Sequence, residues 1–260
     1  PMTVFFKSLF LPIMVSSMLN LKATPSVDSI PSPVVLAEQL LYGTRTGKPV
    51  AETEKMLQEL DPVLLEKALQ DPDSSLAFWL NIYNGFTQMA LQRNPALYQQ
   101  RGKFFRSKQF IVAGQPVSLD RIEHGIIRSS AIKWGLGYLR NPFPGKFEKR
   151  FRLRQRDFRI HFALNCGAKS CPPIAYYKAD QLDRQLEIAT RNYLKSEVTY
   201  DSLTNRVMLP VLFSWFRGDF GGKKKIYKLL EKYQLIPNRS RPTIRYLPYN
   251  WEISINAETE

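Results

Sequence analysis

The chain has 260 residues, of which 44% are hydrophobic and 12% aromatic. This composition excludes an intrinsically disordered protein and supplies enough apolar residues for a sizeable core. The formal net charge of +14 favours anionic partners, such as nucleic acid, a membrane surface or an acidic substrate. No recognition helix, glycine-rich phosphate loop or zinc-finger spacing accompanies the charge, so the sequence carries no specific nucleic-acid motif.

The N-terminal segment has the layout of a secretory signal peptide. Lys7 precedes a mostly apolar run, and small and polar residues follow it. The run is too short and too interrupted for a transmembrane helix, so we predict none. We expect residues 1–23 to be the signal peptide and the protein to be exported to the periplasm or secreted. The alternative is an amphipathic N-terminal helix that packs on the domain of a cytoplasmic protein.

Residues 24–69 are predicted to form a linker followed by a helical segment. Residues 24–34 are rich in Ser and Pro, and apolar positions then recur at helical spacing, with a new helix starting at Asp61-Pro62. Residues 76–91 are apolar almost all round, which is typical of a buried helix.

Short elements of both kinds follow in the rest of the chain. Residues 101–117 predict short strands, and Ser118 is a good cap for a helix over 119–131. Further strands are predicted at 158–166, 206–209 and 243–247, and further helices at 181–196, 210–216 and 223–233. Because helices and strands do not alternate regularly, we predict an α+β fold. We expect a single domain over 70–256 with a small antiparallel sheet and an N-terminal helical extension.

The scarce thiols and imidazoles indicate one site. The chain has only two histidines and two cysteines, and His161, Cys166 and Cys171 lie close together in sequence, with His124 in an earlier motif. These side chains are the best suited to nucleophilic and acid–base chemistry near neutral pH. We expect both cysteines to be reduced, although export would favour a bridge. Cys166 is the preferred nucleophile, because the N–H groups after it, starting at Gly167, would be free to bind an oxyanion.

Glu123 and His124 lie on the predicted helix 119–131. At about 100° per residue, Glu123 falls inside the apolar stripe and His124 at its edge. A buried carboxylate needs a partner, because an unpaired charge in the interior is costly. We expect Glu123 to point inward and contact a histidine or a backbone donor near residues 161–171. A structural salt bridge to an arginine is the alternative.

A polar stripe crosses the otherwise apolar helix 76–91. Asn81, Asn84 and Gln88 follow one another at spacings of three and four and share one face. Buried amides must be hydrogen-bonded, and these could bind backbone, orient an imidazole or stabilise an oxyanion. We predict that Asn81 and Asn84 are binding residues in the pocket of the same site, with a purely structural role as the alternative.

A metal site is a rival use of the same thiols and imidazoles. Together with His124, the segment from His161 to Cys171 would supply two nitrogen and two sulfur ligands. The spacing differs from that of short zinc motifs, so we predict neither a metal nor another cofactor.

Five segments resemble the motif regions of the DUF547 family. They read AFWLNIYN at 77–84, SLDRIEHGIIR at 118–128, RIHFALNCGAKSCPP at 159–173, LFSWFRGDFG at 212–221 and RYLPYNW at 245–251. The resemblance covers about residues 70–256, and Arg128 at the end of the second motif is a further candidate binding residue. One departure is Asn250, where the family pattern has Asp before the tryptophan.

The resemblance implies a domain of unknown function related to papain-like cysteine peptidases or transglutaminases. It further implies a Glu–His–Cys set that maps onto Glu123, one of His124 and His161, and Cys166 or Cys171. The hypothesis is a thiol-dependent hydrolase or acyl transferase that acts on a peptide or acyl compound. The alternative is a non-catalytic binding module whose basic face holds an anionic partner.

Overall fold

Three short helices open the part of the chain that the structure describes. The structure is a computed structural model that describes Pro1 and residues 31–255, so the predicted signal peptide after Pro1 and most of the predicted linker lie outside it. The helices are α1 (Pro33–Arg45), α2 (Ala51–Glu59) and α3 (Pro62–Ala68). The predicted helix start at Asp61-Pro62 is confirmed, because the Asp61 carboxylate caps α3 by accepting from the backbone N–H of Val63 at 2.6 Å.

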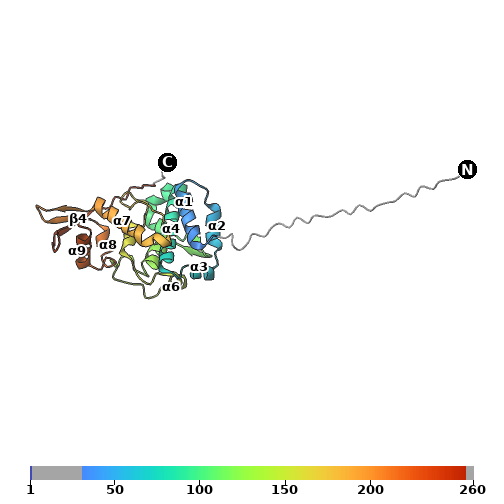
Figure 1. Ribbon diagram of the computed structural model, residues 1–260, viewed down its shortest axis with the longest axis horizontal. Coiled ribbons are helices and arrows are strands. Elements are labelled where there is room, and N and C mark those ends of the chain that lie inside the picture. The colour runs from blue at the N-terminus through green and yellow to red at the C-terminus, as the bar shows by residue number, and fades with distance from the viewer. Residues whose placement is uncertain (2–30, 256–260) are drawn as a thin grey trace. The chain divides into compact units, whose positions relative to one another are not determined.

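Helix α4 (Pro72–Arg93) is the central helix of the fold. Every residue from 75 to 91 is buried, which confirms the prediction made from its all-round apolar character. Figure 1 shows α1 beside α4. The helices approach closely at Gly85, where a Cβ atom would come within 3.1 Å of the Leu40 side chain. The ring of Trp79 meets Phe147 of α6 (Lys146–Phe151) edge-on, which joins a later segment to the same core.

Residues 95–117 are partly helical, where the sequence predicts only short strands. A 3-10 helix, η2 (Pro95–Gln100), leads into α5 (Arg101–Arg106), so the prediction for residues 101–106 is wrong. The helical turn of α5 buries two adjacent phenylalanines, which an alternating strand could not place on one side. The expected strands follow as the antiparallel hairpin β1 (Phe110–Val112) and β2 (Gln115–Val117).

A second core lies around a three-stranded sheet in the C-terminal part. Strand β4 (Arg206–Pro210) pairs antiparallel with β3 (Thr199–Asp201) and parallel with β5 (Thr243–Leu247). The predicted strands at 206–209 and 243–247 are confirmed as β4 and β5, whereas β3 was not predicted. The sheet is mixed, because the chain crosses over through two helices before β5. Figure 1 shows this sheet with its helices. The helices of this part are η5 (Ala179–Gln181), α7 (Leu182–Glu197), α8 (Leu212–Trp215) and α9 (Lys223–Lys232).

The segment before Cys166 is not the predicted strand. Residues Phe158–Phe162 form the 3-10 helix η4, and the Asp157 carboxylate caps it by accepting from the Arg159 N–H at 2.9 Å. The chain after η4 needs no partner strand, because the Asn84 side chain binds its backbone. The α+β class is nevertheless confirmed, with helices around a small antiparallel hairpin and a mixed sheet.

Candidate functional site

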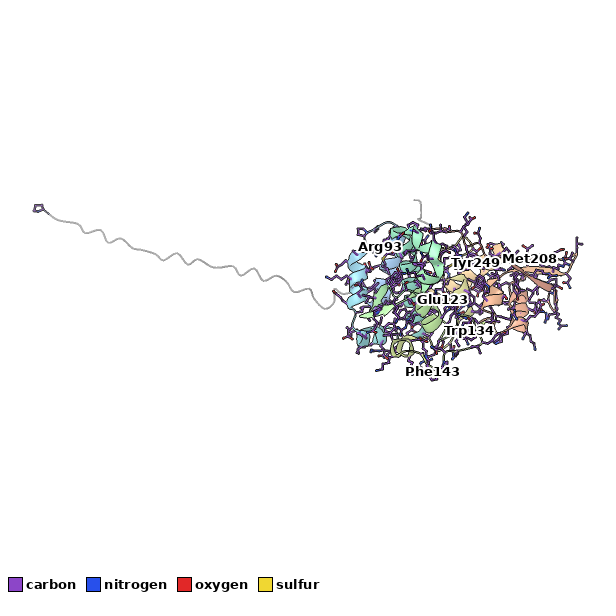
Figure 2. The ribbon with its side chains drawn as sticks, turned by 180° about the vertical axis from the view of Figure 1, so that it is seen from behind. Arg93, Glu123, Trp134, Phe143, Met208 and Tyr249 are labelled. Atoms are coloured by element: carbon purple, nitrogen blue, oxygen red, sulfur yellow. The ribbon has the colours of Figure 1, made fainter. Side chains whose placement is uncertain are left out.

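A cavity of about 310 Å³ is lined by four of the five predicted catalytic residues, all except Cys171. Its walls are mainly aromatic and aliphatic, with a few ionisable side chains among them. Such an apolar cavity with a few polar groups is the usual form of a small-molecule site. Figure 2 labels Glu123 and Tyr249, two of the lining residues. The cavity is lined by Tyr83, Phe105, Asp120, Glu123, His124, Lys133, His161, Leu164, Cys166, Pro172, Leu212, Trp215, Phe216, Tyr249 and Trp251.

Cys166 and Cys171 form a close pair at this cavity. Both are free thiols, and their sulfur atoms lie 2.6 Å apart. The Tyr249 hydroxyl lies 3.3 Å from the Cys166 sulfur and 3.2 Å from the Cys171 sulfur. Of these two described cysteines, only Cys166 lines the cavity. The pair therefore consists of Cys166, which lines the cavity, and Cys171, whose sulfur is in contact with that of Cys166.

The two thiols have opposite acidities. Burial opposes ionisation of Cys171, but hydrogen bonds from the Cys166 thiol, the Tyr249 hydroxyl and backbone N–H groups of Ala168 and Cys166 lower its pKa below the ordinary value. One of these, from the Cys166 N–H, is 2.9 Å long. The hydrogen bond to Cys171 and burial raise the pKa of Cys166 well above the ordinary value. Cys171 is therefore the more acidic thiol, and Cys166 is its proton-bearing partner.

The loop that carries Cys166 is fixed by Asn84 of α4. The Asn84 amide donates to the Ala163 carbonyl at 3.0 Å and accepts from the Asn165 N–H at 2.8 Å. The Asn165 side chain continues this network, donating to the Pro172 carbonyl at 2.9 Å and accepting from the Gly167 N–H at 2.9 Å. The Gly167 N–H is therefore not free for an oxyanion, contrary to the expectation from the sequence.

Neither asparagine of the α4 stripe lines the cavity, so the prediction that Asn81 and Asn84 lie in the pocket is wrong. Both are fully buried. Asn81 makes the same two-bond clasp as Asn84, donating to the Tyr177 carbonyl at 2.7 Å and accepting from the Tyr177 N–H at 3.0 Å. The amides thus replace a strand partner for two irregular segments, and only Asn84 acts next to the thiols.

His161 is held by a carboxylate that the sequence analysis did not include. Its Nε2 lies 2.9 Å from Oδ2 of Asp219, and its ring stacks on Phe216 with 4.1 Å between ring centroids. Burial lowers the pKa of His161 despite the Asp219 charge, so the ring is neutral near pH 7. Because an ionised carboxylate only accepts, Nε2 carries the proton and Nδ1 keeps its lone pair. His161 lines the cavity in this form.

Asp219 is the electrostatic centre of the site. Besides His161, it accepts from Arg128 Nε at 2.6 Å and from a guanidinium nitrogen of Arg156 at 2.6 Å. Burial opposes its ionisation, but the hydrogen bonds from His161 and Arg128 hold the pKa of Asp219 well below its ordinary value. Arg128, a predicted binding residue, is fully buried and stacks over the Phe216 ring instead of lining the cavity. Its role in the structure is to pair with Asp219.

His124 faces an arginine instead of a carboxylate. Its Nδ1 lies 2.8 Å from a guanidinium nitrogen of Arg128, which can only donate, so Nδ1 accepts and Nε2 carries the proton. Burial lowers the pKa of His124, and the charge of Arg128 lowers it further against the opposing effect of Glu123. The nearest carboxylate oxygen to Nε2 belongs to Asp120, at 3.8 Å. The Nε2–H of His124 is therefore without a short hydrogen bond among the described residues.

Glu123 points inward, but toward Tyr83 and its neighbour His124. The Tyr83 hydroxyl donates to Glu123 Oε2 at 3.2 Å, and Glu123 Oε1 lies 3.4 Å from Nδ1 of His124. Burial opposes ionisation, but the charges of His124, Arg128 and His161 lower the pKa of Glu123. The segment Arg121–Ile127 is a π-helix, a form of helix frequent at functional sites, and it directs both Glu123 and His124 to the cavity.

Asp219, Tyr249 and Asn165 belong to the site but are not among the residues predicted for it. Asp219 and Tyr249 lie in two of the motifs that carry the family resemblance, which was the available signal for them. Asn165 stands beside Cys166 and offered a weaker signal. The rival zinc site is not supported, because no group of three or more His, Cys, Asp or Glu side chains within residues 31–255 could hold a metal ion.

Residues 67–194 match the family model described as "Protein of unknown function, DUF547". This part of the chain is a DUF547 domain. The match contains Glu123, His161 and both cysteines, while Asp219 and Tyr249 come from the chain that follows it. No curated protein and no solved structure has significant similarity to the chain, so the relation to papain-like and transglutaminase folds stays a prediction.

None of the helices within residues 31–255 is both long enough and apolar enough to cross a bilayer.

Proposed function

We propose that this DUF547 domain protein is a thiol-dependent hydrolase or acyl transferase. The observation that carries the proposal is that Cys166 and His161 line one cavity while Asp219 orients the imidazole. A histidine held at Nε2 by a carboxylate has Nδ1 available as a base, which is the logic of nucleophile–base–orienter sites. Asp219 takes the role for which the sequence suggested Glu123.

The thiol pair supplies the nucleophile. The Cys171 thiolate accepts the proton of Cys166 across the contact between their sulfurs, which gives a Cys166 thiolate that faces the cavity. That sulfur attacks the acyl carbon, and the bond from this carbon to the leaving group breaks as a thioester forms. A neutral leaving group takes its proton from the Cys171 thiol, and in the second step His161 Nδ1 removes a proton from water or from the acceptor that cleaves the thioester.

Two further groups contribute to substrate binding in this proposal. The Nε2–H of His124 is a donor on the cavity wall and suits a carbonyl oxygen. The rings of Trp215, Tyr249 and Trp251 pack against one another along the wall and suit an apolar acyl group or an aromatic side chain. The substrate class is therefore an acyl compound or peptide with an apolar group beside the acyl carbon.

The proposal is tested with p-nitrophenyl esters of increasing chain length and with peptide thioesters. The wild-type protein should release nitrophenol in a burst and then turn over, whereas Cys166→Ala should lose both phases and His161→Gln should keep the burst and lose the turnover. Lys228→Ala, on the distant helix α9, serves as the control for handling and purity. Folding of each variant is checked by its melting temperature, and activity that survives in Cys166→Ala contradicts the proposal.

The competing function is the non-catalytic binding module with a basic face. It predicts no acyl intermediate on either thiol, whichever ester or thioester is offered.

We further propose, from the apolar segment after Lys7, that the protein is exported with residues 1–23 removed. N-terminal sequencing of the mature protein tests this point, and a start at the first residues of the chain contradicts it.

A further inference from the structure

The loop at residues 132–144 exposes a group of large apolar side chains. Trp134 is 76% exposed and Phe143 is 87% exposed, and both are labelled in Figure 2. Single exposed apolar residues are common on protein surfaces, but five within one short loop are not. The exposed set consists of Trp134, Leu136, Tyr138, Leu139 and Phe143.

This apolar loop is held in place by hydrogen bonds. The Leu139 carbonyl accepts from the Ile132 N–H at 3.0 Å, and the Leu136 carbonyl accepts from the Gly218 N–H at 2.6 Å. At its centre Gly137 has a φ of 83° and packs so closely on Asp219 that a Cβ atom would come within 2.6 Å of it. Because the backbone is braced, the side chains are displayed on a fixed support and lose little backbone entropy on binding.

The surroundings of the apolar loop are positively charged. Among residues 129–156 the only acidic residue is Glu148, which is buried. Of the cations in this segment, several pair with carboxylates, including Lys133 with Asp120 and Arg150 with Glu66. Four others are exposed and form neither an ion pair nor a side-chain hydrogen bond among the described residues, whereas the exposed Arg152 donates to the Ser130 hydroxyl. These four are Arg140, Lys146, Lys149 and Arg154.

We propose that the apolar loop and its four cations bind the surface of a membrane that contains anionic phospholipids. Tryptophan and tyrosine favour the interface between headgroups and acyl chains, where Phe and Leu add buried apolar area. Lysines and arginines beside them attract the phosphates and anionic headgroups. A protein partner would use the apolar residues equally well, but it gives no reason for a surrounding segment without an exposed acid. The proposal does not depend on the thiol chemistry.

The test is sedimentation of the full-length protein with lipid vesicles. Phosphatidylcholine vesicles that contain phosphatidylserine are compared with pure phosphatidylcholine vesicles, at low and high salt. The double variant Trp134→Ser/Phe143→Ser removes the two most exposed rings, and Arg140→Gln/Lys149→Gln removes two unpaired cations. Leu203→Ser is the matched control, because Leu203 is 96% exposed but lies in the turn between β3 and β4.

The proposal predicts salt-sensitive binding to the anionic vesicles. We expect the aromatic double variant to bind at least about tenfold more weakly, because two rings lose their burial. The charge variant should also weaken binding to anionic vesicles, while Leu203→Ser should bind like the wild type. All variants share the apolar residues near the N-terminus, so their differences report on the loop. Equal binding by the aromatic variant and the wild type would overturn the proposal. Self-association of the protein that depends on the loop, without binding to vesicles, would also overturn the proposal.

Discussion

Nε2 of His161 lies 2.9 Å from Oδ2 of Asp219, a residue 58 positions further along the chain. The contact joins the 3-10 helix η4, which precedes the cysteine pair, to the segment after α8. It fixes the tautomer of a neutral imidazole and thereby leaves Nδ1 as a base on the cavity wall. Two arginines hold Asp219 ionised in turn, so its charge serves both the stability of the fold and the orientation of the site.

Removing the Asp219 charge should therefore cost both stability and activity. Asp219→Asn keeps the shape but leaves the fully buried Arg128 without its anionic partner, so we expect a loss of about 3–5 kcal/mol in the free energy of unfolding. Urea denaturation measures this loss. The matched control is Glu66→Gln, which breaks the exposed ion pair with Arg150 and should cost less than about 1 kcal/mol. Similar losses in the two variants would contradict this account.

The two buried asparagines of α4 should have separable effects. Asn84→Ala and Asn81→Ala each remove a two-bond clasp, so each should lower the free energy of unfolding by about 1–3 kcal/mol. Asn84 holds the backbone next to Cys166, whereas Asn81 holds Tyr177. Only Asn84→Ala should therefore change the rate at which iodoacetamide alkylates the thiols. An equal change of this rate in both variants would contradict the local role of Asn84. It would show that the thiols respond to the lower stability of the whole fold.

The stability of the protein should fall with acidification in two stages. The lowered pKa values of His124 and His161 mean that the unfolded chain binds more protons than the fold below about pH 6.5, so the free energy of unfolding begins to fall there. The contribution of Asp219, whose pKa is lowered by folding, is present above its ordinary value of 3.8 and is lost below it. Urea titrations from neutral to acidic pH measure both stages. A His124→Gln/His161→Gln variant should lack the first stage, and a flat wild-type profile from pH 7 to pH 5 would contradict the assignment.

The cysteine pair should alkylate at a pH below that of an ordinary thiol. The lowered pKa of Cys171 supplies a thiolate, and the Tyr249 hydroxyl helps to stabilise it. Tyr249→Phe keeps the ring and removes this donor, so it should shift the pH profile of iodoacetamide labelling upward. Because the sulfurs are in contact, a mild oxidant such as diamide should block labelling and dithiothreitol should restore it. A profile that is the same in wild type and Tyr249→Phe would exclude the proposed role of Tyr249.

Local sequence patterns predicted most of the helices and strands. The cap at Asp61, the apolar residues of α4 and the spacing of apolar positions in α7 depend on neighbours in the sequence, so they are visible without the fold. The predicted strand at 158–166 is wrong, because alternation of apolar residues also fits a 3-10 helix followed by a loop. The deciding feature was the Asn84 amide, which binds this segment from a helix far away in sequence.

The site residues were found, but their pairings were not. Side-chain type and scarcity identified His161, Cys166 and Cys171, whereas the partner of His161 depends on how the chain returns after α8. The helical wheel correctly predicts that Glu123 points inward. It does not predict that the Tyr83 hydroxyl donates a hydrogen bond to its carboxylate. The sequence likewise does not predict that the Gly167 N–H donates its hydrogen bond to the Asn165 side chain.

The most direct test of the central claim is to trap and map the acyl group. The protein is mixed briefly with a p-nitrophenyl ester, quenched in acid and digested, and the acylated residue is identified by mass spectrometry. The account predicts a single acyl group on Cys166 that accumulates in His161→Gln, because the imidazole is needed to release it. An absence of acyl groups from both cysteines in the wild-type protein, with every ester tried, would contradict the account.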